Sequence, residues 1–343
     1  MAKKPLAVLT FSLLIFFAGL GTVRAEEINK NFHQSFNVKE GDSLSLRFGD
    51  GNVQLMPWEK NTIDVKVRYR ADIYRVGIRL GKKQDFDVEF RQTANTVYVT
   101  GKEPGSATIG FYNQRVYEYV YEIHSPNYIA LDLEGDDGNV GIENWAAGIE
   151  CRIDDGDVRL RNIAGGKTTI RGEDGDVEID NLNGDLAIKV DDGDIDLTAC
   201  DMESCRVEGE DGNITISQSK GTYNLVSDDG DVVMKNIEAK GLSITTADGD
   251  VDVDLAAADM LDADIKTDDG NITIDLEKKL SVSYYVTADD ADSIRIAMNN
   301  VENSKEDRHT KSGSINGGNG RLKIQTAEGD VTIKEGRGNR SVL

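Results

Sequence analysis

The chain has 343 residues, a formal net charge of −23 at pH 7 and only three cysteines and three histidines. The acidic excess lies in residues 131–280, which hold 13 basic against 39 acidic residues. Such a segment repels nucleic acid and anionic lipid and attracts cations and basic partners, so we expect no nucleic-acid binding.

Residues 1–25 have the pattern of a secretory signal peptide. Lys3 and Lys4 precede an apolar run from Leu6 to Leu20, and small residues lead to Ala25. No later stretch approaches the roughly 18 apolar residues that a membrane helix needs. We therefore expect an exported protein, periplasmic or extracellular, without membrane insertion.

Residues 26–130 are expected to form an N-terminal β cap and the first rung or rungs of a repeat. The phrase FGDGNVQL surrounds Gly51, and strand-like sequence follows in residues 62–125. Tyr117, Tyr119 and Tyr121 alternate along this sequence and would line one face of a strand. We predict them as a partner-binding surface; the alternative is that they pack the cap against the end of the repeat.

Residues 131–280 contain one phrase eight times, with Asp before a central glycine and Asp or Asn after it. The glycines follow one another at steps of 18, 19, 18, 19, 18, 19 and 21 residues: Gly138, Gly156, Gly175, Gly193, Gly212, Gly230, Gly249 and Gly270. Regular internal repetition is typical of a stacked array. Glycine permits the positive φ of a tight corner, and Asp or Asn can hydrogen-bond the turn backbone.

Apolar residues recur two and four positions after each glycine, and five and seven positions before it, as in Val158, Leu160, Cys151 and Ile149. A further, mostly apolar set lies seven positions after the glycine. Each unit therefore predicts two short strands with apolar inner faces. The fold class is all-β. We favour a single-stranded β-solenoid with rungs of about 18–19 residues, because stacking makes equivalent positions neighbours; an antiparallel β meander or sandwich with Asp-Gly hairpins is the alternative.

Residues 281–343 are expected to form atypical C-terminal rungs and a cap, since terminal repeats must close the open ends of a stack. AEGDVTI repeats the phrase around Gly329, Ala291 stands where a glycine is expected, and KSGSINGG around Gly313 is interpreted as a degenerate copy.

These features together resemble the bacterial "putative adhesin" domain family. The resemblance rests on FNVKEGDSLSLRFGDGNVQL, on VYEIHSPNYIALDLEGDDGNVGI and on the serial strand-DG-strand copies, and it covers nearly all of residues 30–335. It implies a β-solenoid, a cell-envelope setting and a role in adhesion. It brings no catalytic residues.

The corner acids are the first candidate site. Stacked carboxylates about 4.8 Å apart repel one another by roughly 1 kcal/mol in bulk water. Solvation and salt can offset this, and we favour that explanation; the alternative is bridging by calcium, which prefers carboxylate oxygens. The candidate calcium ligands are Asp155, Asp157, Asp174, Asp176, Asp192, Asp194, Asp229 and Asp231.

The other reactive residues predict no chemistry. Cys151, Cys200 and Cys205 occupy inferred core positions, and a Cys200–Cys205 disulfide or reduced thiols are both left open. We identify no catalytic motif and no cofactor apart from calcium. We expect a non-enzymatic binding or scaffold module of the cell envelope that binds a cell-envelope protein or polysaccharide. A self-assembling structural protein and a carbohydrate-active β-helix enzyme are the alternatives.

Overall fold

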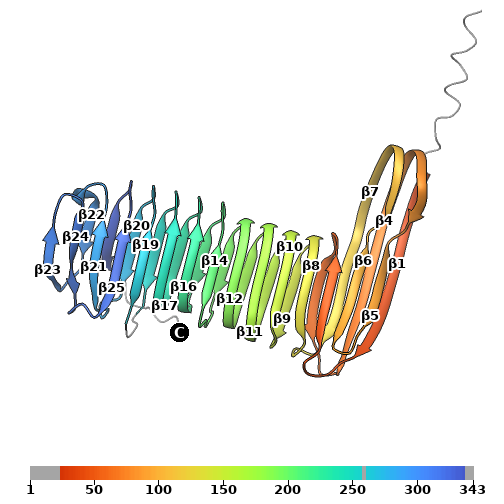
Figure 1. The fold of residues 1–343 in the computed structure, drawn as a ribbon, viewed down its shortest axis with the longest axis horizontal. Helices are drawn as coiled ribbons and strands as arrows, with labels where there is room; N and C mark the ends of the chain where they lie inside the picture. Colours follow the sequence, from red (N-terminus) through yellow and green to blue (C-terminus); the bar gives the residue numbers. More distant parts are fainter. Residues whose placement is uncertain (1–23, 257–259, 337–343) are drawn as a thin grey trace, which may run out of the picture.

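The computed structural model describes residues 24–256 and 260–336 and consists of strands stacked into a long solenoid (Figure 1). One strand precedes each repeated glycine and one follows it. Cys151 of β10 (Ile149–Asp155) pairs in parallel with Ile170 of β11 (Val158–Asp174), its equivalent one rung later. Because successive rungs pair in parallel, the β-solenoid prediction is confirmed and the antiparallel meander is wrong.

The strands before the glycines form one face of the stack, the pre-glycine face. Its order in space combines whole strands with the second halves of β11, β12 and β17: β6 (Thr96–Lys102), β2 (Ser43–Phe48), β8 (Ala130–Asp137), β10, β11, β12 (Val177–Asp192), β14 (Cys205–Glu208), β16 (Lys220–Ser227), β17 (Val232–Thr246), β19 (Asp262–Lys266), β25 (Gly320–Gln325) and β21 (Val282–Thr287).

The strands after the glycines form the opposite face of the stack, the post-glycine face. It includes the first halves of the same three long strands, in the order β7 (Gly105–Ser125), β3 (Asn52–Pro57), β9 (Val140–Trp145), β11, β12, β13 (Ile195–Thr198), β15 (Ile214–Ser217), β17, β18 (Val251–Leu255), β20 (Ile272–Leu276), β26 (Val331–Glu335) and β22 (Ile294–Ala297).

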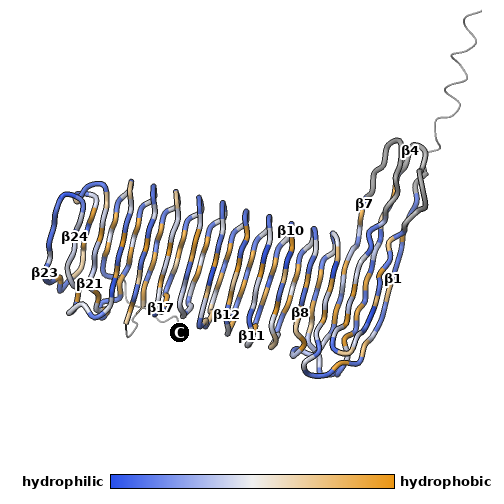
Figure 2. Tube along the Cα trace, viewed as in Figure 1, coloured by the Kyte–Doolittle hydropathy of each residue, from blue (hydrophilic) through white to orange (hydrophobic). Residues whose placement is uncertain are grey.

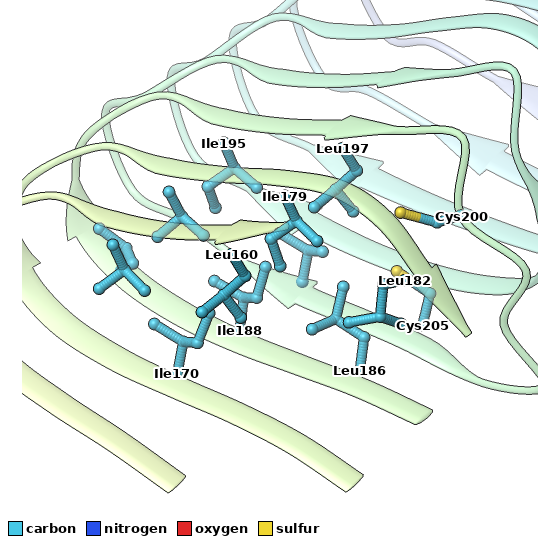
Figure 3. Close-up of a cluster of buried hydrophobic side chains, with 14 of the residues drawn as sticks. Leu160, Ile170, Ile179, Leu182, Leu186, Ile188, Ile195, Leu197, Cys200 and Cys205 are labelled. Carbon is cyan, nitrogen blue, oxygen red and sulfur yellow. The ribbon is translucent and has the colours of Figure 1, made fainter. Parts of the chain in front are cut away.

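The core lies between these two faces, and hydrophobic and hydrophilic residues alternate along the strands (Figure 2). The predicted inward positions are buried in every repeat of residues 131–280, including Thr168 and Tyr223. Figure 3 shows how Leu160, Ile179 and Leu197 stack as equivalent residues of successive rungs. Burial at about 25 cal/mol per Å² of apolar surface makes this core the main source of stability.

The N-terminal rungs are out of chain order. The rung of β2 and β3 lies between the rung of β6 and β7 and that of β8 and β9, so the first rung in sequence is second in space. Residues 24–37 and much of residues 62–125 form an arm: β4 (Thr62–Gln84) pairs antiparallel with both β1 (Arg24–Asn37) and β7, and β5 (Asp87–Gln92) pairs antiparallel with β6. The arm projects from the stack (Figure 1).

The C-terminal rungs are also out of chain order. The rung of β25 and β26 inserts between the rung of β19 and β20 and that of β21 and β22. Antiparallel strands β24 (Thr310–Ile315) and β23 (Val301–Glu306) continue the pre-glycine face beyond β21. On the pre-glycine face, both ends therefore finish in antiparallel strands, which limits further parallel stacking there.

Three predictions about the flanks have different outcomes. Gly51 and Gly329 stack as glycines of true rungs, and Ala291 begins the 3₁₀ turn η1 (Ala291–Ser293) at a corner, as expected. Gly313 is not a corner: it lies inside β24 opposite Tyr284, and the interpretation of KSGSINGG as a repeat is wrong. Of the predicted signal peptide, residues 1–23 lie outside the described residues, and Arg24 starts β1.

Candidate functional site: the Asp-Gly corner

The repeated glycines form a column along one edge of the stack. A Cβ atom on Gly156 would meet the carbonyl oxygen of Gly138 in the rung before, and each later glycine repeats this contact down to Gly329. Gly156 has a φ of +149°, but Gly230 is not among the positive-φ glycines. Positive φ therefore explains only part of the column. Close approach of the neighbouring backbone is the shared requirement.

The Asp or Asn after each glycine forms a second column, held by hydrogen bonds between rungs. Its Oδ1 atom accepts the backbone N–H of the equivalent residue in the next rung. The donor-to-acceptor distances are 2.9 Å for Asn139 to Asn52, 2.8 Å for Asp157 to Asn139, 3.3 Å for Asp176 to Asp157, 3.0 Å for Asp194 to Asp176, 2.9 Å for Asn213 to Asp194, 3.1 Å for Asp231 to Asn213, 2.9 Å for Asp250 to Asp231, 2.7 Å for Asn271 to Asp250 and 3.0 Å for Asp330 to Asn271. We call this column the Asx ladder. It explains why Asp and Asn interchange: both supply the acceptor.

The Asp before each glycine has a different environment. Asp155, Asp174, Asp192 and Asp229 are exposed, and none forms an ion pair with another described residue. Desolvation, followed by repulsion from Asp137 and Asp174, raises the pKa of Asp155. The pre-glycine aspartates thus form a column of like charges, which we call the acidic edge.

The eight predicted calcium ligands divide between these two columns. Asp157, Asp176, Asp194 and Asp231 belong to the Asx ladder, where one carboxylate oxygen accepts a backbone N–H. Asp155, Asp174, Asp192 and Asp229 belong to the acidic edge. Among the described residues, no group of three or more His, Cys, Asp or Glu side chains is placed to hold a metal ion. Calcium binding stays a prediction.

The three predicted partner-binding tyrosines do not share a face. Tyr119 and Tyr121 are buried, whereas Tyr117 is 55% exposed and donates a hydrogen bond to Asp72. The reason is a β-bulge: β4 and β7 pair Arg70 with Glu118 and then Ala71 with Val116, so Tyr117 has no partner in the register. A bulge reverses the alternation of side chains. The expected three-residue surface is therefore wrong, and only Tyr117 is available to a partner.

The two buried tyrosines close the N-terminal end of the core. The Tyr119 hydroxyl donates to Glu103 at 2.7 Å and lies 2.9 Å from the Tyr121 hydroxyl. Burial raises the pKa of both tyrosines and of Glu103, although the Tyr119 hydrogen bond opposes the rise at Glu103. Gly51 leaves room for the two tyrosine rings, since a Cβ atom on it would meet both of them. The alternative prediction, packing of the cap, holds for this pair.

The opposite edge carries a feature that the repeat alignment did not identify. The residue six positions after the glycine has positive φ in successive rungs, as in Asn144 (55°), Asn162 (55°) and Asn181 (60°). The Asn162 side chain donates to Asn144 at 3.0 Å, and Asn181 donates to Asn162 at 2.9 Å. Asn tolerates this conformation better than most residues. The recurrence of Asn six positions after the glycine was the feature of the sequence that could have identified this corner. We call this edge the return corner.

His33, Ser35 and Asp64 lie together but do not have the order of a catalytic triad. His33 and Ser35 both bond to Asp64 Oδ1, so the carboxylate lies between the hydroxyl and the imidazole. Burial works against ionisation of Asp64, yet these bonds outweigh it and lower its pKa. In a triad the histidine is the general base and must contact the hydroxyl directly, whereas His33 contacts Asp64.

The three cysteines are free and buried. Burial raises the pKa of the Cys151 and Cys205 thiols to about 12. Cys200 and Cys205 lie at the same return corner (Figure 3). As core thiols with raised pKa values, they are poor nucleophiles.

Comparison with known proteins gives a family and a set of structures. A family model described as Toastrack DUF4097 matches residues 43–204 and again 183–334. No curated protein matches the chain. In the part of the chain described here, no helix has the length and apolar character to span a bilayer.

Several solved structures match over most of both chains. A putative adhesin from Parabacteroides distasonis ATCC 8503 is 14% identical, with 89% of this chain and 97% of that chain covered and a TM-score of 0.43. A putative lipid binding protein from the same strain is 11% identical, with 88% and 96% covered and a TM-score of 0.37. A putative cell adhesion protein from Clostridium sporogenes ATCC 15579 is 12% identical, with 90% and 100% covered and a TM-score of 0.22.

Proposed function

The chain belongs to the Toastrack DUF4097 family, and from that premise we propose that it is an exported, non-enzymatic binding module of the cell envelope, with a role in adhesion. Its mechanism is display. The rigid stack presents the acidic edge to a partner that carries positive charge. The partner is a cell-envelope protein or a polysaccharide with basic groups.

The acidic edge is the observation that carries this proposal. Asp155 is exposed and lacks an ion-pair partner among the described residues, and desolvation, followed by repulsion from neighbouring aspartates, raises its pKa. A column of like charges is less stable alone than with a counter-charge. A cationic partner that spans several rungs would relieve repulsion at each of them, which favours association and gives it a strong dependence on salt.

The rest of the rung supports display better than catalysis. The Asx ladder occupies the residues after the glycine with hydrogen bonds between rungs, as from Asn213 to Asp194. The outward residues of the two faces pair with one another across rungs, as Arg159 does with Glu178 at 3.3 Å. These groups rigidify the surface, and the aspartates of the acidic edge remain without ion pairs among the described residues.

The ends of the stack favour a binding module over a self-assembling one. The outermost strand of the pre-glycine face at the C-terminal end, β23, is exposed and carries Glu302, Lys305 and Glu306. Charged residues on an edge strand oppose pairing with another chain. Apparent mass that stays constant as concentration rises would agree with this.

Binding to isolated cell envelopes tests the proposal. We define the edge variant as Asp155→Asn, Asp174→Asn and Asp192→Asn, three neutral isosteres in consecutive rungs. We expect the wild-type protein to be exported, to sediment with envelopes at low salt and to be released as salt rises, and the edge variant to bind at least severalfold less. Cytoplasmic retention, or equal binding by the two proteins, would contradict the proposal.

A further inference from the structure

The return corner varies in length, whereas the Asp-Gly corner does not. Between the last core residue of one rung and the first of the next, the return corner has three residues at 146–148, four at 164–167 and again three at 183–185. The register shift between Ala164 and Lys167 lies at one of the longer corners. In repeat proteins, such variation concentrates on one face, which is often the binding face.

A groove with a volume of about 1280 Å³ runs along this corner. It is lined by Gly166 and by nearly complete corners of the following rungs, residues 183–185, 201–203, 220–222 and 238–240, and Met260 lies at its far end. Gly166, Gly184 and Gly221 contribute no side chains, which leaves space at their own corners.

The length of the groove matches a short extended chain. From the corner of Gly166 to that of Met260 there are five steps between rungs, which at about 4.8 Å each span roughly 24 Å. At about 3.3 Å per residue, this accommodates seven or eight residues of extended polypeptide.

The charge of the groove is negative. Its acidic residues are Asp185, Asp201, Glu203 and Glu238, all exposed, and its basic residues are Lys220 and Lys240. Lys220 pairs with Asp201 at 2.8 Å. Asp185 and Glu203 have no such partner among the described residues, and neither has Lys240, so the net negative charge of the groove lies at the two neighbouring corners of Asp185 and Glu203.

The lining also indicates the class of ligand. No aromatic side chain is among the groove residues, although sugar rings are commonly bound by stacking on aromatics. Exposed acids lie instead beside small residues such as Gly184 and Ala239, and Met260 at the far end is 67% exposed. This combination suits lysine or arginine side chains, whose heads pair with carboxylates while their stems cover apolar surface.

We propose that the return-corner groove binds an extended, basic segment of a partner polypeptide, about seven or eight residues long. This site is separate from the acidic edge, because the two lie at opposite corners of the rung. It therefore goes beyond the proposed function and does not depend on it.

The test compares two variants of equal charge. We define the groove variant as Asp185→Asn, Glu203→Gln and Glu238→Gln; the edge variant changes the charge by the same amount on the opposite corner. The probe is a capped octapeptide of alternating lysine and threonine, measured by fluorescence anisotropy in about 0.15 M salt, where charges beyond roughly 8 Å are screened. A capped octapeptide of alternating glutamate and threonine is the peptide control.

We expect the groove variant to bind the lysine peptide about tenfold more weakly, as three exposed charge pairs predict, and the edge variant to change its Kd less than twofold. Circular dichroism and melting temperature confirm that both variants are folded. Equal weakening by both variants would mean general attraction to an acidic protein and overturn the proposal. No weakening by the groove variant, or binding of a neutral oligosaccharide at the groove in place of the peptide, would overturn it as well. Loss of envelope binding by the edge variant alone concerns only the proposed function.

Discussion

The backbone N–H of Asn213 donates a hydrogen bond of 2.9 Å to the side-chain Oδ1 of Asp194, one rung earlier in the stack. Asp194 in turn donates its own N–H to Asp176 at 3.0 Å. Each residue of the Asx ladder is thus acceptor for the next rung and donor to the previous one. The corner is tied together by the Asp or Asn that follows each repeated glycine.

Replacement of Asp194 separates the hydrogen bond from the charge. Asp194→Ala removes the acceptor and should lower the free energy of unfolding by about 1 kcal/mol, the net worth of such a bond. Asp194→Asn keeps an Oδ1 acceptor and should retain most of the stability. Urea denaturation of the two variants and the wild type measures this. Equal losses in both variants would assign the position to charge instead.

Replacement of Gly230 tests the close contact between rungs. A Cβ atom there would meet the carbonyl oxygen of Gly212, so Gly230→Ala should destabilise the protein by about 1–3 kcal/mol through overpacking. Gly141→Ala is the control, because a Cβ atom on Gly141 has only the Val53 carbonyl at 4.0 Å. We expect it to change stability by about 0.5 kcal/mol or less. Thermal melts that rank the two variants alike would contradict the contact argument.

The acidic edge predicts a pH dependence. Desolvation and the neighbouring aspartates raise the pKa of Asp155 above the ordinary value of an aspartate. With a raised pKa, the folded protein favours the protonated carboxyl of Asp155. The stability that this provides is fully present below the pKa of Asp155 in the unfolded chain and is lost as pH rises through its pKa in the folded protein. Asp155→Asn should therefore be more stable than wild type at pH 7, with a difference that disappears below pH about 4 and shrinks with added salt.

The control for this pH series is Glu40→Gln, an exposed acid away from the edge. Melting temperatures of the three proteins from pH 3 to pH 8 make the comparison. A gain at pH 7 that is equally large at pH 3 would show that the effect of Asp155→Asn is not electrostatic.

The bulge at Tyr117 predicts opposite outcomes for two nearby tyrosines. Tyr121→Ala empties a fully buried site and should cost about 3 kcal/mol or more. Tyr117→Ala should change stability by about 0.5 kcal/mol or less, since its ring is largely exposed. If Tyr117 contacts the envelope partner, its replacement lowers binding at unchanged stability. Chemical denaturation and envelope sedimentation measure the two effects separately.

Calcium binding is tested by thermal unfolding after treatment with chelator. Because the Asx ladder already uses one oxygen of Asp157, Asp176, Asp194 and Asp231, we expect calcium, magnesium and sodium at matched ionic strength to raise the melting temperature alike. A saturable rise with calcium alone would instead establish binding to the folded state, since a ligand stabilises the state that it binds.

The sequence predicted the repeating rung closely. The offsets from the glycine identified inward residues such as Val158, Ile170 and Leu182, and these three are buried. It also placed Trp145 at a corner, where its indole N–H donates to the Ile129 carbonyl at 2.9 Å in the core. These predictions succeed because a solenoid rung contacts mainly its neighbours, so a local pattern contains most of the information.

The sequence predicted side-chain directions less well at a β-bulge and in a segment that resembles the repeat without being one. The alternation of Tyr117, Tyr119 and Tyr121 continues through the sequence, but the bulge turns Tyr117 outward. Gly313 lies in a repeat-like phrase, yet it pairs opposite Tyr284 inside an antiparallel strand. In both cases the partner strand determines the side-chain direction, and the partner is distant in sequence.

The sequence by itself determined the rung, its buried positions and the acidic character of the corner, because these follow from alternation and from residue type. Only the tertiary structure decided the order of the rungs at both ends. The rung of residues 43–57 lies one position nearer the middle of the stack than that of residues 96–125, and the rung of residues 320–335 lies one position nearer the middle than that of residues 282–297. The tertiary structure also decided that the variable corners align into one groove. Equivalent rungs have similar inner faces, so local pattern does not distinguish their possible neighbours; the connections and end caps of the whole chain select one order.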